Sequence, residues 1–412
     1  MDKLKLLFLG KYTSQEAVTA YVGNTFIKRL LLNDGVSFLD YRALYYGRGY
    51  RGARGHIMAY VRENGINAVL WWADPCEIYY DVPFFEELRK KCFLAMILGD
   101  SALFYEVSYQ YYAQAMDLVI AEEFVTVHKL AQIGVNAITH FGFFDPDQYR
   151  RIDNLPKDMD ASFVGALGER VGRLEYIKHL SDNGIRVRTF GADSPGGRIT
   201  LDKKIEVINK SRINLDFTGP GLVSRLTRKQ QINRRKNQIK GKCLEYAMCG
   251  GFSLVEYVPG LENLFEIGKE IDVFHDKEEL LEKARYYLKE EDKREAVALN
   301  GYKRARRDYD AKLTAPRLLA TIDGLRGRKA YKPSEIYLDE GFIRDFTTYR
   351  VLLIIKFVKT GDWRFAFEEL RVILKNRLLD WWQIRVFLIE EVLDKFPRIK
   401  SALKAVLEGG GG

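Results

Sequence analysis

A short stretch of the chain combines residue types that could bind a nucleoside diphosphate. Lys240 and Lys242 precede CLEYAM, a segment able to form a helix, and this segment carries one carboxylate, Glu245. Gly250 and Gly251 would end the helix, because glycine adopts the backbone conformations that follow a helix C-terminus. Lysine side chains and free backbone N–H groups bind phosphate, and a carboxylate accepts hydrogen bonds from ribose hydroxyls. The pattern therefore predicts a site for a nucleoside diphosphate.

A second set of residues suited to phosphate lies earlier in the chain. Gly165 and Gly168 occupy a turn between an expected strand and an expected helix, so backbone N–H groups of the turn would face the start of that helix. Arg170 and Arg173 follow closely. A departing diphosphate gains negative charge, so fixed cations beside it stabilise the transition state more than the ground state. A single basic residue is more often solvated surface, and the prediction therefore depends on the two stretches together.

Strand-like apolar runs alternate with helix-like segments over most of the chain. This alternation is typical of parallel sheets covered on both faces. We therefore predict an α/β fold with two Rossmann-like domains, 1–150 and 151–312, then a crossover helix and linker at 313–334 and a helical extension at 335–408. The expected strands are 4–9, 36–41, 66–72, 93–100 and 117–123 in the first domain, and one opening 160–170, then 185–191, 213–217, 252–255 and 270–274 in the second.

The glycine-rich stretch 45–61 contains GRGYRG, which begins like a dinucleotide-binding fingerprint. It follows two tyrosines rather than a clear strand end, and the fingerprint requires a strand immediately before it. We interpret this stretch as a flexible loop on the acceptor side that leads into a helix.

Composition and charge restrict the class of protein. The chain has 412 residues with 47% hydrophobic and 29% charged residues, which fits a protein of more than one globular domain. It has no apolar run long enough to cross a bilayer, its start does not resemble a signal peptide, and its four cysteines lack metal-like spacing. We expect a cytoplasmic protein with buried free thiols. The net charge of +9 admits nucleic acid, an anionic membrane surface or a phosphorylated small molecule as partner.

The extension at 335–408 is amphipathic and strongly helical, with Trp363, Trp381 and Trp382 among its apolar positions. One interpretation is a helical appendage packed on the two domains, or a dimer interface. The other is an interfacial helix that contacts an anionic membrane surface, which would make the protein peripheral to the inner face of a membrane. The basic residues that favour this contact are Arg364, Arg371, Lys375, Arg377 and Arg385, and the acids that weaken it are Glu368, Glu369 and Asp380.

The chain also resembles a known family. LEYAMCGGFSLVE and the following GLENLFEIGKEIDVFHDKEELLEKARYYL resemble the C-terminal half of glycosyltransferases with the two-Rossmann-domain B fold (GT-B). The most similar branch is the one related to the CgeB spore-maturation proteins, and the resemblance covers about 155–310. It implies transfer of a sugar from a UDP- or GDP-sugar to a hydroxyl of a saccharide, a lipid-linked saccharide or a protein. It also implies that the donor is bound by the second domain, with Gly260, Leu261 and Glu262 among the contacts.

The resemblance assigns roles to individual residues. Glu245 aligns with the ribose-binding glutamate of retaining families of this fold, and either Arg170 or Arg173 matches the arginine that follows the glycine turn. Those families carry a second glutamate eight positions before the first, where this chain has Asn237. The departure leaves open whether the anomeric configuration is retained or inverted.

The catalytic base is expected from the first domain. Asp100 follows an expected strand, at the point where related enzymes carry His or Asp, and its alternative role is to cap the next helix. Asp74, after the neighbouring strand, is the reserve candidate. A DxD-like sequence, with Asp145 and Asp147, lies between the domains rather than at a strand end. We therefore expect metal-independent catalysis with no cofactor, in which protein cations do the work of a metal.

Two other functions compete with the enzyme. Arg225–Lys242 holds eight basic residues and no acidic ones, which suggests binding to nucleic acid or a transferase that modifies DNA. This run lacks the interleaved aromatic residues that single-strand binding favours, so nucleic acid ranks low as a partner. The third alternative is a catalytically inactive transferase-like scaffold that acts through its C-terminal helices.

Overall fold

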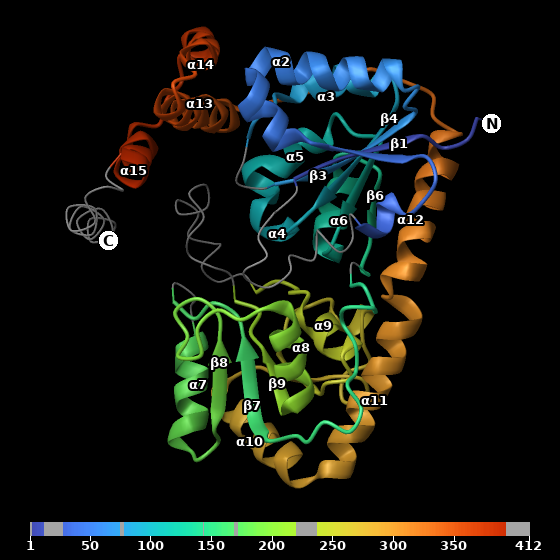
Figure 1. Cartoon of the computed structure of the whole chain (residues 1–412), viewed down its shortest axis with the longest axis vertical. Helices are drawn as coiled ribbons and strands as arrows, with labels where there is room; N and C mark the ends of the chain where they lie inside the picture. Colours follow the sequence, from blue (N-terminus) through green and yellow to red (C-terminus); the bar gives the residue numbers. More distant parts are fainter. Residues whose placement is uncertain are drawn as a thin grey trace.

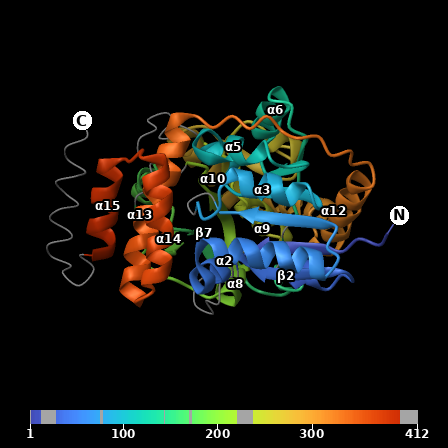
Figure 2. The same ribbon diagram turned by 90° about the horizontal axis from the view of Figure 1, so that it is seen from above.

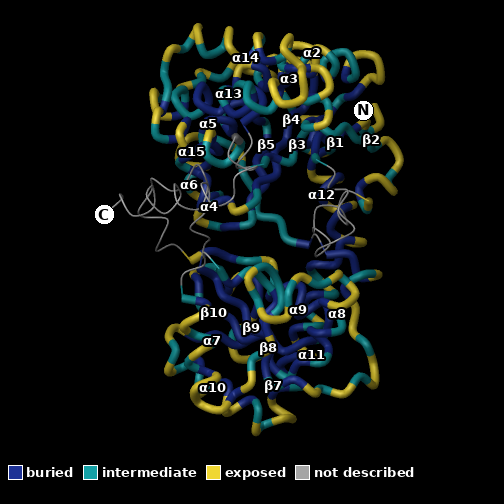
Figure 3. Tube along the Cα trace, turned by 60° about the vertical axis from the view of Figure 1, so that its left-hand side comes forward, coloured by how far each residue is buried: buried dark blue, intermediate teal, exposed yellow. Residues whose placement is uncertain are grey.

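The computed structural model describes residues 2–11, 28–74, 78–142, 144–168, 172–219 and 237–392. These residues form two α/β bodies, one above the other in Figure 1, with a group of C-terminal helices beside the upper body. Each body is built around one parallel sheet. Both sheets are buried along most of their length and appear dark blue in Figure 3. The α/β fold with two Rossmann-like domains and a helical C-terminal part is confirmed.

The first sheet has six parallel strands in the order β2-β1-β3-β4-β5-β6. The strands are β1 (Leu6–Gly10), β2 (Val36–Asp40), β3 (Ala68–Ala73), β4 (Phe93–Leu98), β5 (Leu118–Ala121) and β6 (Ala137–Thr139). All five expected strands are present, with ends that differ by at most two residues. The short strand β6 was not predicted, because its three residues are only half-buried and follow no apolar run.

Helices cover both faces of this sheet. They are α2 (Tyr41–Glu63), α3 (Val82–Arg89), α4 (Ser101–Phe104), the π-helical turn Tyr105–Tyr109, α5 (Gln110–Ala113) and α6 (Phe124–Gln132). Pro83 lies in the first turn of α3, where its missing N–H costs no helical hydrogen bond.

Helix α2 shows that the loop predicted for 45–61 is wrong. Asp40 caps the helix by accepting hydrogen bonds from the backbone N–H groups of Arg42 and Ala43. The helix continues through the glycines and is interrupted only at Gly49, where φ is +68°. A Cβ at Gly49 would lie 2.4 Å from the ring of Phe365, so glycine at the kink allows a distant helix to pack there.

The second sheet has five parallel strands in the order β11-β10-β9-β7-β8. The strands are β7 (Met159–Val164), β8 (Val187–Phe190), β9 (Ser211–Asp216), β10 (Ser253–Glu256) and β11 (Asp272–Phe274). The helices are α7 (Arg173–Asp182), α8 (Leu201–Lys210), α9 (Lys242–Met248), α10 (Lys277–Lys289) and α11 (Glu291–Asp308). All five expected strands are present here as well.

Helix α12 (Ala311–Arg326) returns the chain to the first sheet. Its buried residues Leu318 and Ile322 share one apolar cluster with Leu6, Phe8 and Leu70 of the first sheet. Figure 1 shows α11 and α12 rising along one side of both bodies. The helix therefore links the two domains by burying apolar surface in the first one.

The C-terminal extension lies on the opposite side of the first domain from α12, as Figures 1 and 2 show. It consists of α13 (Glu340–Thr360), α14 (Trp363–Asn376) and α15 (Trp381–Val392). Arg350 of α13 is fully buried and donates hydrogen bonds to the Tyr45 hydroxyl at 2.8 Å and to Glu369 of α14 at 3.3 Å. The extension is therefore joined to α2 through a buried polar network as well as through apolar contacts.

Three of the four cysteines, Cys92, Cys243 and Cys249, are free and buried, as predicted. Burial raises the pKa of the Cys92 thiol to about 12, so this thiol stays protonated. Cys76 lies outside the described residues.

Candidate functional site

Asp100 lies at the carboxyl end of β4, where it meets the second domain. Its backbone is left-handed, with φ of 50°, and its side chain makes no capping hydrogen bond to α4. Its Oδ1 accepts hydrogen bonds from Gln238 Nε2 at 2.6 Å and from Lys240 Nζ at 3.1 Å. The structure therefore brings together a proposed base and a proposed phosphate ligand from different domains.

Glu122 is a further candidate that the sequence analysis missed. It follows β5, the neighbour of β4, and is close enough to Asp100 and Lys240 to interact with both electrostatically. The pKa of Glu122 is raised to about 8, mainly by burial and further by the charges of Asp100 and Glu123, against the opposing effect of Lys240. Glu122 is therefore protonated at neutral pH. Its position could have identified it, because Glu122 is an acidic residue directly after a strand, and Asp100 was selected for the same reason.

Asp74 follows β3 and forms an ion pair with Lys11, which follows β1. The two strands are hydrogen-bonded neighbours, so their carboxyl ends bring these side chains together. The carboxylate of Asp74 is thus held by a cation of its own domain, whereas Asp100 faces the other domain.

The turn after β7 depends on two glycines from neighbouring strands. Gly191, just after β8, has φ of +128°, and a Cβ there would lie 2.4 Å from the carbonyl oxygen of Gly165. Only glycine permits this approach of two backbones. A Cβ at Gly165 would lie 3.3 Å from Cε of Lys242, so that lysine lies against the turn. The two stretches predicted to bind phosphate are therefore adjacent.

Lys242 is the most electrostatically perturbed cation of this region. Burial lowers the pKa of its ammonium to about 8, although Asp216 acts in the opposite direction. Asp216 is itself buried at the end of β9, and burial raises its pKa to about 6. Its Oδ2 accepts a hydrogen bond from the backbone N–H of Cys243 at 3.1 Å, so Asp216 satisfies one N–H at the start of α9. Lys242 and Arg173 are the cations that act on Asp216 in this cluster.

Arg173 is buried and its side chain contacts the backbone of the turn after β7. Its guanidinium donates hydrogen bonds to the carbonyl oxygens of Ala166 at 2.8 Å and Phe217 at 3.3 Å. It therefore holds the loops after β7 and β9 together while adding positive charge beneath them. Gly168 closes the turn next to Asp193, because a Cβ there would lie 2.5 Å from the Asp193 carboxylate. Arg170 lies outside the described residues.

Glu245 is buried in α9 and forms an ion pair with Lys204 of α8, which is buried too. Lys204 was not anticipated, because nothing in the sequence links the two positions. Asn237, where related families carry a second glutamate, donates a hydrogen bond to the carbonyl oxygen of Tyr257 at 3.5 Å.

The segment Gly260–Glu262 lies at the contact between the domains. Gly260 has φ of +103°, and a Cβ there would lie 3.3 Å from the ring of Phe124 in the first domain. Glu262 accepts hydrogen bonds from the Gly260 N–H at 3.0 Å and the Tyr257 hydroxyl at 2.5 Å, and Leu261 is buried. These contacts fix the shape of the loop next to the first domain.

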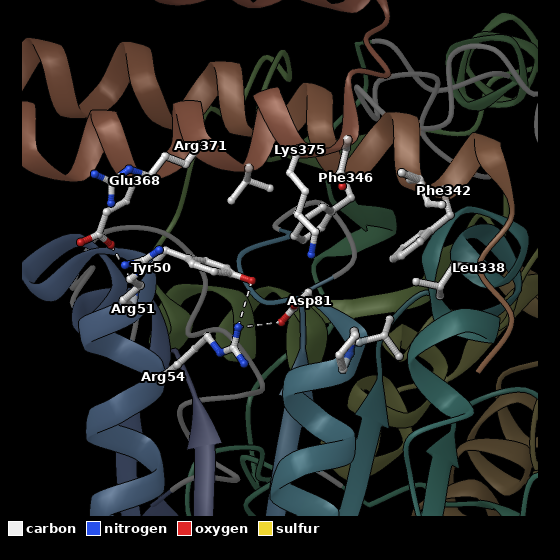
Figure 4. Close-up of a pocket in the computed structure, with 15 residues that line it drawn as sticks. Tyr50, Arg51, Arg54, Asp81, Leu338, Phe342, Phe346, Glu368, Arg371 and Lys375 are labelled. Carbon is white, nitrogen blue, oxygen red and sulfur yellow. Dashed lines mark hydrogen bonds and ion pairs between the residues drawn. The ribbon is translucent and has the colours of Figure 1, made fainter. Parts of the chain in front are cut away.

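A cavity of about 460 Å³ lies between the first domain and the extension (Figure 4). Its walls come from α2, the start of α3, the residues before α13, and α13 and α14. Four basic side chains and two acidic ones line it, together with aliphatic and aromatic side chains. The charged residues are Arg51, Arg54, Arg371, Lys375, Asp81 and Glu368.

Arg54 differs from the other three cations in its contacts. Arg54 forms an ion pair with Asp81 at 3.4 Å and donates a hydrogen bond to the Tyr50 hydroxyl at 3.2 Å, as drawn in Figure 4. No hydrogen bond or ion pair joins the side chain of Arg371 or Lys375 to another residue that the structure describes. The cavity therefore has an excess of positive charge on its α14 side.

No three His, Cys, Asp or Glu side chains are placed to hold a metal ion within the described ranges. The DxD-like pair is engaged elsewhere. Arg29 donates hydrogen bonds to Asp145 at 2.9 Å and to Asp147 at 2.5 Å, and Lys312 also contacts Asp147. These ion pairs join the segment between the domains to the first domain and to α12.

Comparisons with known proteins agree with this architecture. Residues 173–320 match the family model described as glycosyl transferase-like. No curated protein matches the chain by sequence. Sucrose-phosphate synthase from Thermosynechococcus elongatus superposes with a TM-score of 0.60 at 10% identity, over 79% of this chain and 100% of that one. The fold is that of the GT-B glycosyltransferases.

Two further solved structures show the same fold. Anabaena HepE in complex with UDP has a TM-score of 0.57 at 12% identity, over 78% of this chain and 100% of that one. A glycosyltransferase from Rickettsia africae has a TM-score of 0.54 at 10% identity, over 80% of this chain and 100% of that one. The match to the family model supports glycosyl transfer as the function of this GT-B chain.

Within the described residues, no helix combines the length and apolarity that a membrane span requires.

Proposed function

We propose that the protein is a metal-independent glycosyltransferase that moves a sugar from a UDP- or GDP-sugar to an acceptor hydroxyl. The observation that carries this proposal is the contact between Asp100 and Lys240, which places a carboxylate of the first domain beside the cations of the second. Within GT-B enzymes we propose the closest kinship with the CgeB-related branch, on the residues of the stretch around α9.

The donor diphosphate would lie over the turn at Gly165. Lys242 lies against that turn, and Lys240 is two residues away at the contact between the domains. Both ammonium groups would stabilise the negative charge that develops on the departing diphosphate. Glu245 would accept hydrogen bonds from the ribose, with Lys204 orienting its carboxylate. Gly260–Glu262 would line the same site from the side of the interdomain contact.

Asp100 is the proposed base that accepts the proton of the acceptor hydroxyl. A general base must be ionised and must face the reacting groups. Glu122 keeps its proton at neutral pH, and Asp74 is held by Lys11 of its own domain, whereas Asp100 meets the second domain. Because Glu122 is protonated, it adds no second negative charge beside Asp100.

The acceptor would be a saccharide, a lipid-linked saccharide or a protein hydroxyl on the side of the first domain. Tyr50 and Arg51, from the glycine-rich stretch, line the cavity between α2 and the extension. Its aromatic side chains Tyr50, Phe342 and Phe346 and its excess of positive charge suit a sugar that carries an anionic group.

Calorimetric titration of the full chain with UDP and with GDP tests the proposal. We expect one of them to bind, and Lys242→Ala to weaken binding. Glu245→Ala would leave Lys204 buried without its ion-pair partner, so Glu245→Gln is the cleaner test of the ribose contact. Absence of binding by any nucleoside diphosphate would overturn the proposal.

No described feature favours nucleic acid as the partner. Most of the basic run lies outside the described residues, and the described Lys240 and Lys242 face Asp100 and the Gly165 turn. Donor hydrolysis that depends on Asp100 would argue against an inactive scaffold.

A further inference from the structure

Helix α14 carries a row of large apolar side chains that face solvent. Trp363, Phe367, Leu370 and Leu374 are 58%, 59%, 38% and 61% exposed. They are spaced by four, three and four residues, which places them on one face of the helix. The opposite face packs on α2 and α13, with Ala366 and Glu369 buried. We call this row the α14 stripe.

A row of cations runs beside the α14 stripe. Arg364, Arg371 and Lys375 are exposed and lie roughly a quarter-turn from the stripe at about 100° per residue. None of the three side chains forms a hydrogen bond or ion pair with another residue in the described part of the chain. Helix α15, which packs on α13, also has exposed Trp381 and Leu388.

Two of the three acids that weaken a membrane contact are buried in the structure, and the third is hydrogen-bonded. Glu369 is fully buried and accepts a hydrogen bond from the Tyr45 hydroxyl at 2.5 Å. Asp380 is buried and accepts hydrogen bonds from backbone N–H groups at the start of α15. Glu368 accepts a hydrogen bond from the Arg51 backbone N–H at 3.1 Å and lines the cavity. Three exposed cations and one half-buried carboxylate, Glu368, therefore lie beside the α14 stripe.

We propose that α14 docks the protein on an anionic lipid surface. Tryptophan and other large apolar side chains enter the boundary between headgroups and acyl chains, and flanking Arg and Lys bind the anionic headgroups. Each basic residue near such a surface adds electrostatic attraction to the anionic headgroups. A second copy packed antiparallel through its stripe is a poorer occupant, because the two rows of cations would then lie on the same side and repel each other.

The docking proposal does not depend on the enzymatic one, but the two together restrict the acceptor. Arg371 and Lys375 belong to the cationic row and also line the cavity. The cavity would therefore open beside the lipid surface. If the protein is a glycosyltransferase, this arrangement favours the lipid-linked saccharide among the three acceptor classes.

Co-sedimentation of the full chain with vesicles tests the proposal. We expect binding to mixed phosphatidylglycerol and phosphatidylcholine vesicles, weakened by salt, and little binding to phosphatidylcholine alone. The variant Trp363→Ser/Phe367→Ser/Leu374→Ser should bind at least about tenfold more weakly, because it removes most of the inserted apolar surface. Arg364→Gln/Arg371→Gln/Lys375→Gln should lose the preference for the anionic lipid.

Matched controls remove similar groups from the second domain. Leu174→Ser/Leu299→Ser removes exposed apolar side chains, and Lys178→Gln/Lys293→Gln/Lys303→Gln removes exposed cations. Both controls should bind vesicles like the wild type, and the stripe variant should bind the nucleoside diphosphate like the wild type. A wild type that ignores anionic vesicles, or a stripe variant that still binds them, would overturn the proposal. A wild-type dimer that the stripe variant converts to monomer in sedimentation would instead assign the stripe to a second copy.

Discussion

The ammonium of Lys240 donates a hydrogen bond to the carboxylate of Asp100 over 3.1 Å, and this contact joins the two domains. Gln238 donates a second hydrogen bond to the same carboxylate oxygen at 2.6 Å. Asp100 is thus positioned by the domain that would bind the donor, although it belongs to the other domain. A residue that is only a helix cap would not need partners from the opposite side of the molecule.

The variant Asp100→Asn should lower the rate of sugar transfer without weakening nucleotide binding. Asparagine keeps an oxygen that can accept the hydrogen bond of Gln238 but cannot take a proton from the acceptor. We expect kcat to fall by about 10²- to 10⁴-fold, the range usual for loss of a general base, with little change in nucleotide affinity. The measurement is donor turnover beside calorimetric binding. Asp74→Asn is the matched control, and a larger loss of kcat in that variant would move the base to Asp74.

Lys242 should make nucleotide binding depend on pH. The free protein holds the pKa of Lys242 at about 8 because the ammonium is buried, and a bound diphosphate would raise it by favouring the charged form. Affinity for UDP or GDP should therefore be constant below about pH 8 and fall above it by up to about tenfold per pH unit. Lys242→Arg stays charged and should remove the fall, whereas Lys242→Met should bind weakly at every pH. An unchanged slope in both variants would exclude Lys242 as its source.

Glu122 should make stability depend on pH in the opposite sense to an ordinary carboxylate. The unfolded chain loses this proton near the ordinary value of 4.5, whereas the folded protein keeps it to about 8. Between these values the unfolded state binds fewer protons, so the free energy of unfolding falls as the pH rises from about 4.5 to about 8. Glu122→Gln mimics the neutral form and should gain stability over the wild type through this window, as measured by urea unfolding at both ends. Exposed Glu278→Gln should show no such gain.

The fold was largely predictable because apolar strands and helices in alternation leave few other architectures. All ten expected strands are present. The glycine-rich part of α2 was mistaken for a loop, since glycine weakens a helix in isolation. Its helical state depends on the Asp40 cap and on packing against Phe365, more than three hundred residues away in sequence.

A site residue could be predicted from the sequence only where its position at the end of a strand or the start of a helix determines what surrounds it. Asp100 and Lys242 could be selected this way. The burial that raises the pKa of Glu122 could not be predicted, because it depends on which strands are neighbours. The ion pair of Glu245 with Lys204 joins two helices with no sequence relationship. The inward direction of Glu369 depends equally on a distant partner, Arg350.

The buried pair of Arg350 and Glu369 yields the last prediction. Both side chains are fully buried, and their charged groups lie 3.3 Å apart, with the Tyr45 hydroxyl bonded to each. Removing one partner leaves an uncompensated charge in the interior, so Arg350→Met or Glu369→Leu alone should lower the free energy of unfolding by about 3–5 kcal/mol. The double variant should be much closer to the wild type, because two apolar side chains can replace a buried ion pair at little cost.

A double-mutant cycle by urea unfolding measures this coupling, since it isolates the term that belongs to the pair. The exposed i,i+4 pair of Arg344 and Glu340 is the matched control, and its cycle should give less than about 1 kcal/mol. Additive losses at Arg350 and Glu369 would mean that the two residues act separately. Strong coupling would show that the attachment of α13 and α14 to α2, and hence the orientation of the α14 stripe, depends on one ion pair in the interior.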